Sequence, residues 1–205
     1  KNKKMILPIV AYGDPVLKKE AEEIEESYPD LKKLVDDMFE SMYEASGVGL
    51  AAPQIGKAIR LFIADGSPFA EEDLEEDEEP DIRAKGIENF KQVFINPIIE
   101  EEFGEEWAFK EGCLSIPKVR EDVVRKEKIR ITYYDENWNF KDEIYDGYAA
   151  RIIQHEYDHI EGVLFTDHLS SIKKKLISKK LQNISKGAVN VDYRMKFPLA
   201  KKGKR

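Results

Sequence analysis

The positions of apolar residues along this chain predict both helices and strands. Apolar residues three and four positions apart are typical of amphipathic helices, and they occur over residues 30–46, 148–161 and 171–186. Because most of the predicted strands precede the second helix and do not alternate with helices, we expect an α+β fold with antiparallel β-sheets packed around that helix. The predicted strands are runs of branched and aromatic residues at 59–65, 92–99, 106–110, 123–125, 128–135 and 138–145.

Turn and cap residues set the expected ends of these elements. Prolines and a glycine within residues 6–15 predict an extended N-terminal arm that ends in a turn. Asp30 is the expected N-cap of an N-terminal amphipathic helix, whose methionines are expected in the core. Gly162 stands where a helix commonly ends in a left-handed residue. Residues 187–205 offer little core, so we expect them to be frayed or ordered only on contact.

Charge is concentrated in two segments. The formal net charge is -8, yet residues 71–81 alone hold nine acids and no base. Since like charges repel, we expect a mobile acidic surface insertion over residues 66–91; a calcium loop would need a glycine and alternating ligands that are missing. Residues 171–205 hold twelve Lys or Arg against one Asp. We expect one folded domain over residues 1–170, followed by this basic C-terminal extension.

The sequence predicts neither membrane insertion nor secretion. No stretch approaches the apolar length of a membrane span, and residues 1–8 lack the apolar run of a secretory signal. The single cysteine, Cys113, cannot form an internal disulfide, which fits a reducing compartment. These features favour a cytoplasmic protein that makes no membrane contact.

The second helix carries the strongest chemical signal in the chain. His155 and His159 are four residues apart, so on a helix they share one face and can bind one metal ion. Glu156, between them, can exchange a proton with a water at that metal. Chance placement of the two histidines is the alternative, but the chain has only three histidines. The pattern therefore indicates a hydrolytic metal site.

A catalytic site of this kind needs a third protein ligand and leaves a further position to water. The metzincin proteases use a third histidine at the position that Phe165 occupies here, and phenylalanine cannot bind a metal. Proteases with a downstream glutamate are also disfavoured, because Glu161 is the last glutamate of the chain. Cys113 is the expected third ligand, although a buried free cysteine is common. His168 is a rival ligand that has no support from spacing.

Three segments in this order resemble the three signature motifs of the peptide deformylases: residues 47–54, 111–115 and 154–159. The resemblance extends over about residues 5–170. It implies a metal-dependent hydrolase that removes the formyl group from the N-terminal formylmethionine of newly synthesised polypeptides.

The resemblance also implies the roles of individual residues. Cys113, His155 and His159 hold one divalent metal ion, Fe2+ or Zn2+, and Glu156 transfers the proton. The negative charge on the former formyl oxygen is stabilised by the metal and by hydrogen-bond donors of two further residues. These residues are Gln54, through its side-chain amide, and Leu114, through its backbone N–H.

The expected substrate-binding residues surround this centre. Gly49 allows the peptide substrate to lie alongside its backbone as an added strand. Val48, Tyr148 and Ile152 are candidates for the apolar pocket of the methionine side chain. Two charged residues, Glu111 and Arg151, either pair at the edge of that pocket or are solvated surface charges.

Two alternatives and one additional partner stay open at this level. The runner-up enzyme is a metalloprotease with the His-Glu-x-x-His motif, and a binding module with a structural metal is a third reading. A closed structural site would need a fourth protein ligand, but there is no second cysteine. Because the substrate emerges from a ribosome, the basic extension at 171–205 is a candidate contact for ribosomal RNA.

Overall fold

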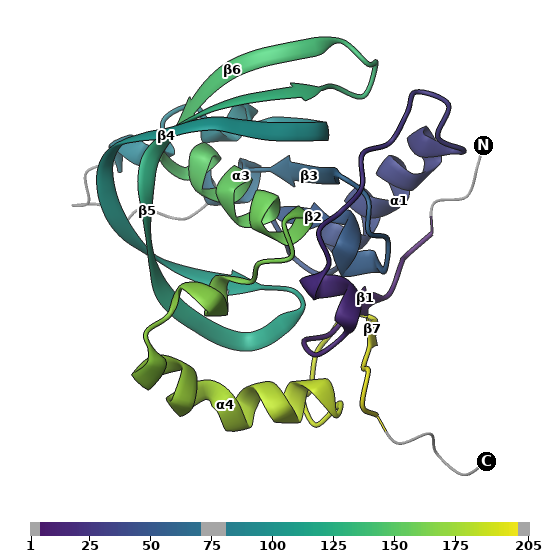
Figure 1. The fold of residues 1–205 in the computed structure, drawn as a ribbon, viewed down its shortest axis with the longest axis vertical. Coiled ribbons are helices and arrows are strands. Elements are labelled where there is room, and N and C mark those ends of the chain that lie inside the picture. The colour runs from purple at the N-terminus through teal and green to yellow at the C-terminus, as the bar shows by residue number, and fades with distance from the viewer. Residues whose placement is uncertain (1–4, 71–80, 201–205) are drawn as a thin grey trace.

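The computed structural model describes residues 5–70 and 81–200 and has a five-stranded antiparallel sheet at its centre (Figure 1). The strand order is β2-β3-β4-β5-β6, so β2 and β6 form the edges. A second, two-stranded sheet joins β1 and β7 in parallel. The strands are β1 (Ile9–Val10), β2 (Gly49–Ala51), β3 (Leu61–Asp65), β4 (Lys91–Cys113), β5 (Ile116–Tyr134), β6 (Phe140–Asp146) and β7 (Met195–Lys196). The α-helices are α1 (Leu31–Glu44), α2 (Ser67–Ala70), α3 (Gly147–Ile160) and α4 (Ser171–Ser185).

Helices cover both faces of the sheet at β3, which is why every residue of that strand is buried. Phe62 and Ala64 pack in one core cluster with the apolar face of α3. Leu61 and Ile63 point the other way and pack with α1. Side chains alternate between the two faces of a strand, so one strand supplies both cores. In Figure 1, α3 lies within the curve of the long strands β4 and β5.

Helix α1 follows the predicted amphipathic pattern, with one correction at its start. Met38 and Met42 are fully buried, as expected for core methionines. Asp30 stands at the N-cap position, but its φ of 54° is left-handed and its side chain makes no capping hydrogen bond. The helix is therefore stabilised by the packing of its apolar face and not by a side-chain cap.

The predicted strands between residues 92 and 135 are parts of two long strands, β4 and β5. Their register shifts at several places, between Ile95 and Ile98 and again between Phe103 and Glu106. Such bulges interrupt the alternation of apolar and polar residues, so the sequence pattern breaks into short pieces. Cys113 is the last residue of β4. The extended backbone places it at a defined point opposite α3.

The first and the last described segments of the chain pack onto the domain and onto each other. Strand β1 pairs with β7, and Ile9 lies opposite Met195. The predicted basic helix is present as α4, which buries Ile177 and Ile184. We expected residues 187–200 to be frayed or ordered only on contact. They contact β1 through β7. No helix among the residues that the structure describes is long and apolar enough to cross a membrane.

The segments that flank the acidic run are folded against the domain. Residues 71–80, where we predicted a mobile acidic insertion, lie outside the described residues. Before them, the Phe69 ring of α2 stacks on Tyr148 of α3, with ring centroids 5.2 Å apart. After them, Ile87 is buried in the same core cluster as α3. The predicted insertion at 66–91 therefore contributes packed residues at both of its ends.

Candidate metal centre

Three side chains that could bind a metal converge between α3 and the end of β4. The spacing of four residues puts His155 and His159 on the same face of α3. Cys113 comes from the adjoining strand, and its Sγ lies 3.3 Å from Nε2 of His159. Candidate ligand atoms of the three residues all lie within 4.8 Å of one another. One soft sulfur and two imidazole nitrogens form a donor set that suits zinc or ferrous iron.

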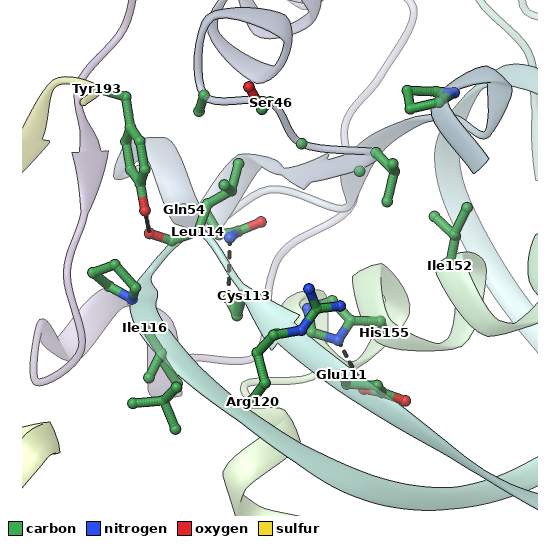
Figure 2. A pocket seen from close by; sticks show the side chains of 18 of the residues that line it. Ser46, Gln54, Glu111, Cys113, Leu114, Ile116, Arg120, Ile152, His155 and Tyr193 are labelled. Carbon is green, nitrogen blue, oxygen red and sulfur yellow. Dashed lines mark hydrogen bonds and ion pairs between the residues drawn. The ribbon is translucent and has the colours of Figure 1, made fainter. Parts of the chain in front are cut away.

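The ring of His155 is oriented by a carboxylate behind it. Its Nδ1 is hydrogen-bonded to Oε2 of Glu111 at 2.9 Å, shown as a dashed line in Figure 2. This bond leaves Nε2 as the nitrogen available to a metal. A carboxylate that holds the second nitrogen of a histidine is a common feature of protein metal sites. The geometry therefore fits a bound metal.

Glu111 lines the cavity and bonds to two arginines and a histidine. It pairs with Arg151, with Nη1 2.9 Å from Oε1, and both residues are buried. Arg125 adds two hydrogen bonds to the same carboxylate, of 2.7 and 3.0 Å. Burial alone raises the pKa of Glu111, but its bonds to His155 and Arg125 outweigh burial and hold the pKa well below its usual range. Glu111 thus lies behind the metal ligands, and its carboxylate oxygens bond to protein groups.

Glu156 is also buried, but without such partners. Its Oε2 has no hydrogen-bond partner in the described part of the chain. Burial raises the pKa of Glu156 to about 7, although His155 and His159 act in the opposite direction. Room for this side chain exists only because residue 49 is glycine. A Cβ built on Gly49 would lie 2.4 Å from Oε1 of Glu156.

The thiol of Cys113 sits among groups that favour its ionised form. Burial alone raises its pKa, but His159 and His155 lower it to about 5. Gln54 also faces the sulfur, with Nε2 3.4 Å from Sγ (Figure 2). The backbone N–H of Ala51 donates to Oε1 of Gln54 and so orients the amide group. A thiolate with an amide donor beside it is the result.

A cavity of about 730 Å³ opens onto these residues (Figure 2). It is lined by the predicted pocket residues Val48, Tyr148 and Ile152, and also by Gly49 and Leu114. The other lining groups that matter below are Gln54, Glu111, Cys113, His155, Glu156, Phe69, Phe109 and residues 190–193.

Comparison with known proteins agrees with this geometry. The family model of the polypeptide deformylases matches residues 6–175. A peptide deformylase of Christiangramia forsetii is 60% identical over 201 residues, which cover 98% of this chain and 100% of that protein. A peptide deformylase of Flavobacterium johnsoniae is 57% identical with the same coverage. This chain belongs to the peptide deformylase family.

Solved structures of the family have the same fold. The peptide deformylase from Ehrlichia chaffeensis has a TM-score of 0.74 and 35% identity, and the match covers 87% of this chain and 96% of that one. The one from Legionella pneumophila has a TM-score of 0.71 and 36% identity, with 87% and 95% covered. The expected α+β fold and the expected membership of the peptide deformylase family are confirmed. Peptide deformylases are metal-dependent hydrolases that remove the formyl group of N-terminal formylmethionine, and membership decides against the protease and the binding module.

Several residues near the deformylase centre escaped sequence reasoning. Arg125 binds Glu111 and also donates to Asp158, with Nη1 2.8 Å from Oδ2. His168, the rival metal ligand, is bonded to the same Asp158 oxygen at 2.7 Å and is not part of the ligand cluster. Phe69 and Phe109 contact Tyr148 beside the cavity. No spacing rule connects these residues, because they come from separate strands and from the flank of the acidic run.

Proposed function

We propose that Cys113, His155 and His159 hold one divalent metal ion and that Glu156 transfers the proton in deformylation. The observation that carries the proposal is the buried Glu156 carboxylate, whose Oε2 has no hydrogen-bond partner among the described residues, beside the three-ligand cluster and at a cavity large enough for a peptide end. A metal bound there would supply Lewis-acid chemistry, since it lowers the pKa of a water and polarises a carbonyl.

Glu156 acts first as a base and then as an acid. Its carboxylate accepts a proton from the water that attacks the formyl carbon, and the same proton then passes to the leaving amine of methionine. The raised pKa of Glu156, about 7, suits a group that must both accept and release a proton near neutral pH. The products are formate and a free N-terminal amine.

Two hydrogen-bond donors stabilise the negative charge that develops on the formyl oxygen. The amide of Gln54 is oriented toward the Cys113 sulfur, with its oxygen already bonded to the backbone. Leu114 follows Cys113 directly, so its backbone N–H belongs to the peptide bond that joins it to the residue with the thiolate. Donors that are already oriented stabilise a developing oxyanion without further rearrangement.

The peptide chain of the substrate adds to the free edge of β2. The carbonyl of Val48 already accepts from Asp65 in the neighbouring strand. Because antiparallel residues alternate in their hydrogen bonding, the N–H and C=O of Gly49 face away from β3. An extended peptide can pair with them as an added strand. The methionine side chain then enters the apolar part of the cavity beside Val48, Tyr148 and Ile152.

We propose Fe2+ as the metal in the cell and Zn2+ as the substitute. The ligand set of one thiolate and two imidazoles accepts both ions, so supply and oxygen exposure decide between them. Metal analysis of protein purified without oxygen tests this assignment. Zinc alone in such preparations, with full activity, would contradict it.

The activity itself is tested with two substrates. Protein prepared without oxygen is incubated with formyl-Met-Ala-Ser and, separately, with a longer unformylated peptide, and formate and free amine are measured. We expect formate from the first substrate and no cleavage of the second. Internal cleavage of the second peptide, or no formate from the first, would overturn the proposal. Protein treated with a chelator and then reloaded with metal serves as the control, because activity should disappear and return.

We also propose that residues 171–205 are a basic extension that contacts ribosomal RNA and that the enzyme acts in the cytoplasm. Helix α4 exposes lysines together with Ile172 and Leu176, each 75% exposed and one turn apart. Positive charge attracts the phosphate backbone of RNA, and the attraction weakens with salt. The remaining domain, residues 1–170, holds the proposed catalytic residues.

Co-sedimentation with ribosomes tests this contact. Replacing Lys174, Lys175 and Lys179 by Gln removes charge from exposed positions of α4. We expect weaker, salt-sensitive binding for this variant and unchanged formate release from a free peptide. The matched control replaces three exposed lysines elsewhere, at Lys19, Lys32 and Lys57. Equal binding by both variants would remove α4 from the contact.

A further inference from the structure

The turn that follows Cys113 is hydrogen-bonded to both ends of the chain. The backbone N–H of Tyr12, in the N-terminal arm, donates to the carbonyl of Ser115 at 2.8 Å. The hydroxyl of Tyr193, near the C-terminus, donates to the carbonyl of Leu114 at 2.7 Å. Figure 2 shows the Tyr193 side chain reaching into the site toward Leu114. Two adjacent carbonyls of one turn thus depend on segments far apart in sequence.

The segment that carries Tyr193 is itself held in place. Strand β7 follows it directly and pairs with β1. The backbone N–H of Ile9 donates to the carbonyl of Arg194 at 2.9 Å, and the Arg194 side chain donates to the carbonyl of Ile6 at 3.0 Å. The position of Tyr193 is therefore fixed by main-chain pairing on its C-terminal side.

Leu114 is confined from the opposite side as well. A Cβ built on Gly47 would lie 2.8 Å from Cδ1 of Leu114, so the two segments are in close contact. Burial raises the pKa of Tyr193, and the nearby Cys113 raises it further. The phenol stays protonated at neutral pH and is always a donor to the turn.

We propose that Tyr193 is a positioning residue for deformylation: its hydroxyl holds the Leu114 turn so that the Leu114 N–H points at the formyl oxygen. The inference rests on the proposed role of Leu114 in the reaction. It places part of the basic extension in the active site, at the mouth of the cavity that residues 190–193 line. The hydrogen bond from Tyr193 to Leu114 affects only the geometry of the turn that faces the formyl oxygen. We therefore expect its loss to weaken transition-state stabilisation more than substrate binding.

The substitution Tyr193→Phe removes the hydroxyl and keeps the ring. With formyl-Met-Ala-Ser we expect kcat to fall about fivefold, as for loss of one hydrogen bond of ordinary net strength, while KM stays within about twofold. The matched control is Tyr134→Phe near the end of β5, where the exposed ring packs against Trp138 and Phe140. An unchanged kcat in Tyr193→Phe, or a raised KM with unchanged kcat, would overturn the proposal.

Amide hydrogen exchange of the metal-free protein gives a second readout that needs no activity. We expect faster exchange over residues 113–116 in Tyr193→Phe than in the wild type, and no change there in Tyr134→Phe. Equal exchange in all three proteins would contradict the holding role of Tyr193. If the wild type released no formate, the proposed function would fail, yet the exchange data would still decide whether Tyr193 orders the turn.

Discussion

Two glutamates beside His155 have the same burial and opposite surroundings. Glu111 and Glu156 are each 4% exposed. Glu111 accepts hydrogen bonds from two arginines and is bonded to Nδ1 of His155, whereas Oε2 of Glu156 has no partner in the described part of the chain. The pKa of Glu111 is lowered and that of Glu156 is raised to about 7.

This difference supports the proposed roles, in which Glu111 holds the site and Glu156 reacts in it. A buried carboxylate is stable as an anion only when charge and hydrogen bonds compensate its lost hydration. Glu111 has that compensation and can keep a histidine in position. Glu156 lacks such hydrogen bonds at Oε2, and we propose that it changes its protonation state during the reaction.

The largest effect is expected from Glu156→Gln, which keeps the shape and removes the proton-transfer group. We expect kcat/KM for formyl-Met-Ala-Ser to fall about 10³-fold, within the usual range for general acid–base catalysis. Metal content should stay the same because the three ligands are untouched. Formate release and metal analysis are the measurements. Retained turnover would remove Glu156 from the mechanism.

Glu111→Gln should damage the fold and the metal site together. Arg125 and Arg151 would be left without their anionic partner, and breaking such a buried pair costs about 3 kcal/mol of unfolding free energy. Metal affinity should fall about 10- to 100-fold, because the ring of His155 loses the carboxylate that orients it. Urea unfolding and competition with a coloured chelator measure the two effects. Loss of activity with wild-type stability and affinity would assign Glu111 a direct role with substrate.

Gly49→Ala tests whether the space around Glu156 matters. The added Cβ collides with the carboxylate, so we expect a loss of about 1–3 kcal/mol in stability and roughly tenfold in kcat. Shortening the partner, as in Gly49→Ala with Glu156→Asp, should relieve the collision and make the two stability changes non-additive. Strictly additive changes would show that the two residues do not interfere.

The smallest effect is expected from Arg125→Lys. Lysine keeps the charge but cannot make the paired hydrogen bonds to Glu111 or reach Asp158 at the same time, so unfolding free energy should drop by about 1–2 kcal/mol. Arg130→Lys is the matched control, since Arg130 makes a similar paired bond to Asp142 on the surface. An exposed pair of this kind contributes little. Equal losses in the two variants would mean that burial of Arg125 adds nothing.

Elements with an unbroken period were predictable from the sequence, and interrupted ones were not. Helix α3 occupies Gly147–Ile160 and ends before Gly162, whose φ is 72°. The long strands β4 and β5 were expected as several short ones, because bulges break their alternation. The fixed position of residues 187–200 could not be predicted from the sequence either. It comes from pairing of β7 with β1, which no local pattern of residues 187–200 expresses.

The sequence by itself determined the ligand types and their spacing: two histidines one helical turn apart, a glutamate between them and one cysteine in the chain. Helical periodicity is local, so such a face can be predicted without a structure. Only the tertiary structure decided which buried carboxylate has its charge balanced by arginines, because Arg125 and Arg151 reach Glu111 from different elements. It also brought Tyr193 to Leu114, across 79 positions of sequence. Burial and long-range hydrogen bonds depend on how distant segments pack, and a single sequence does not display that packing.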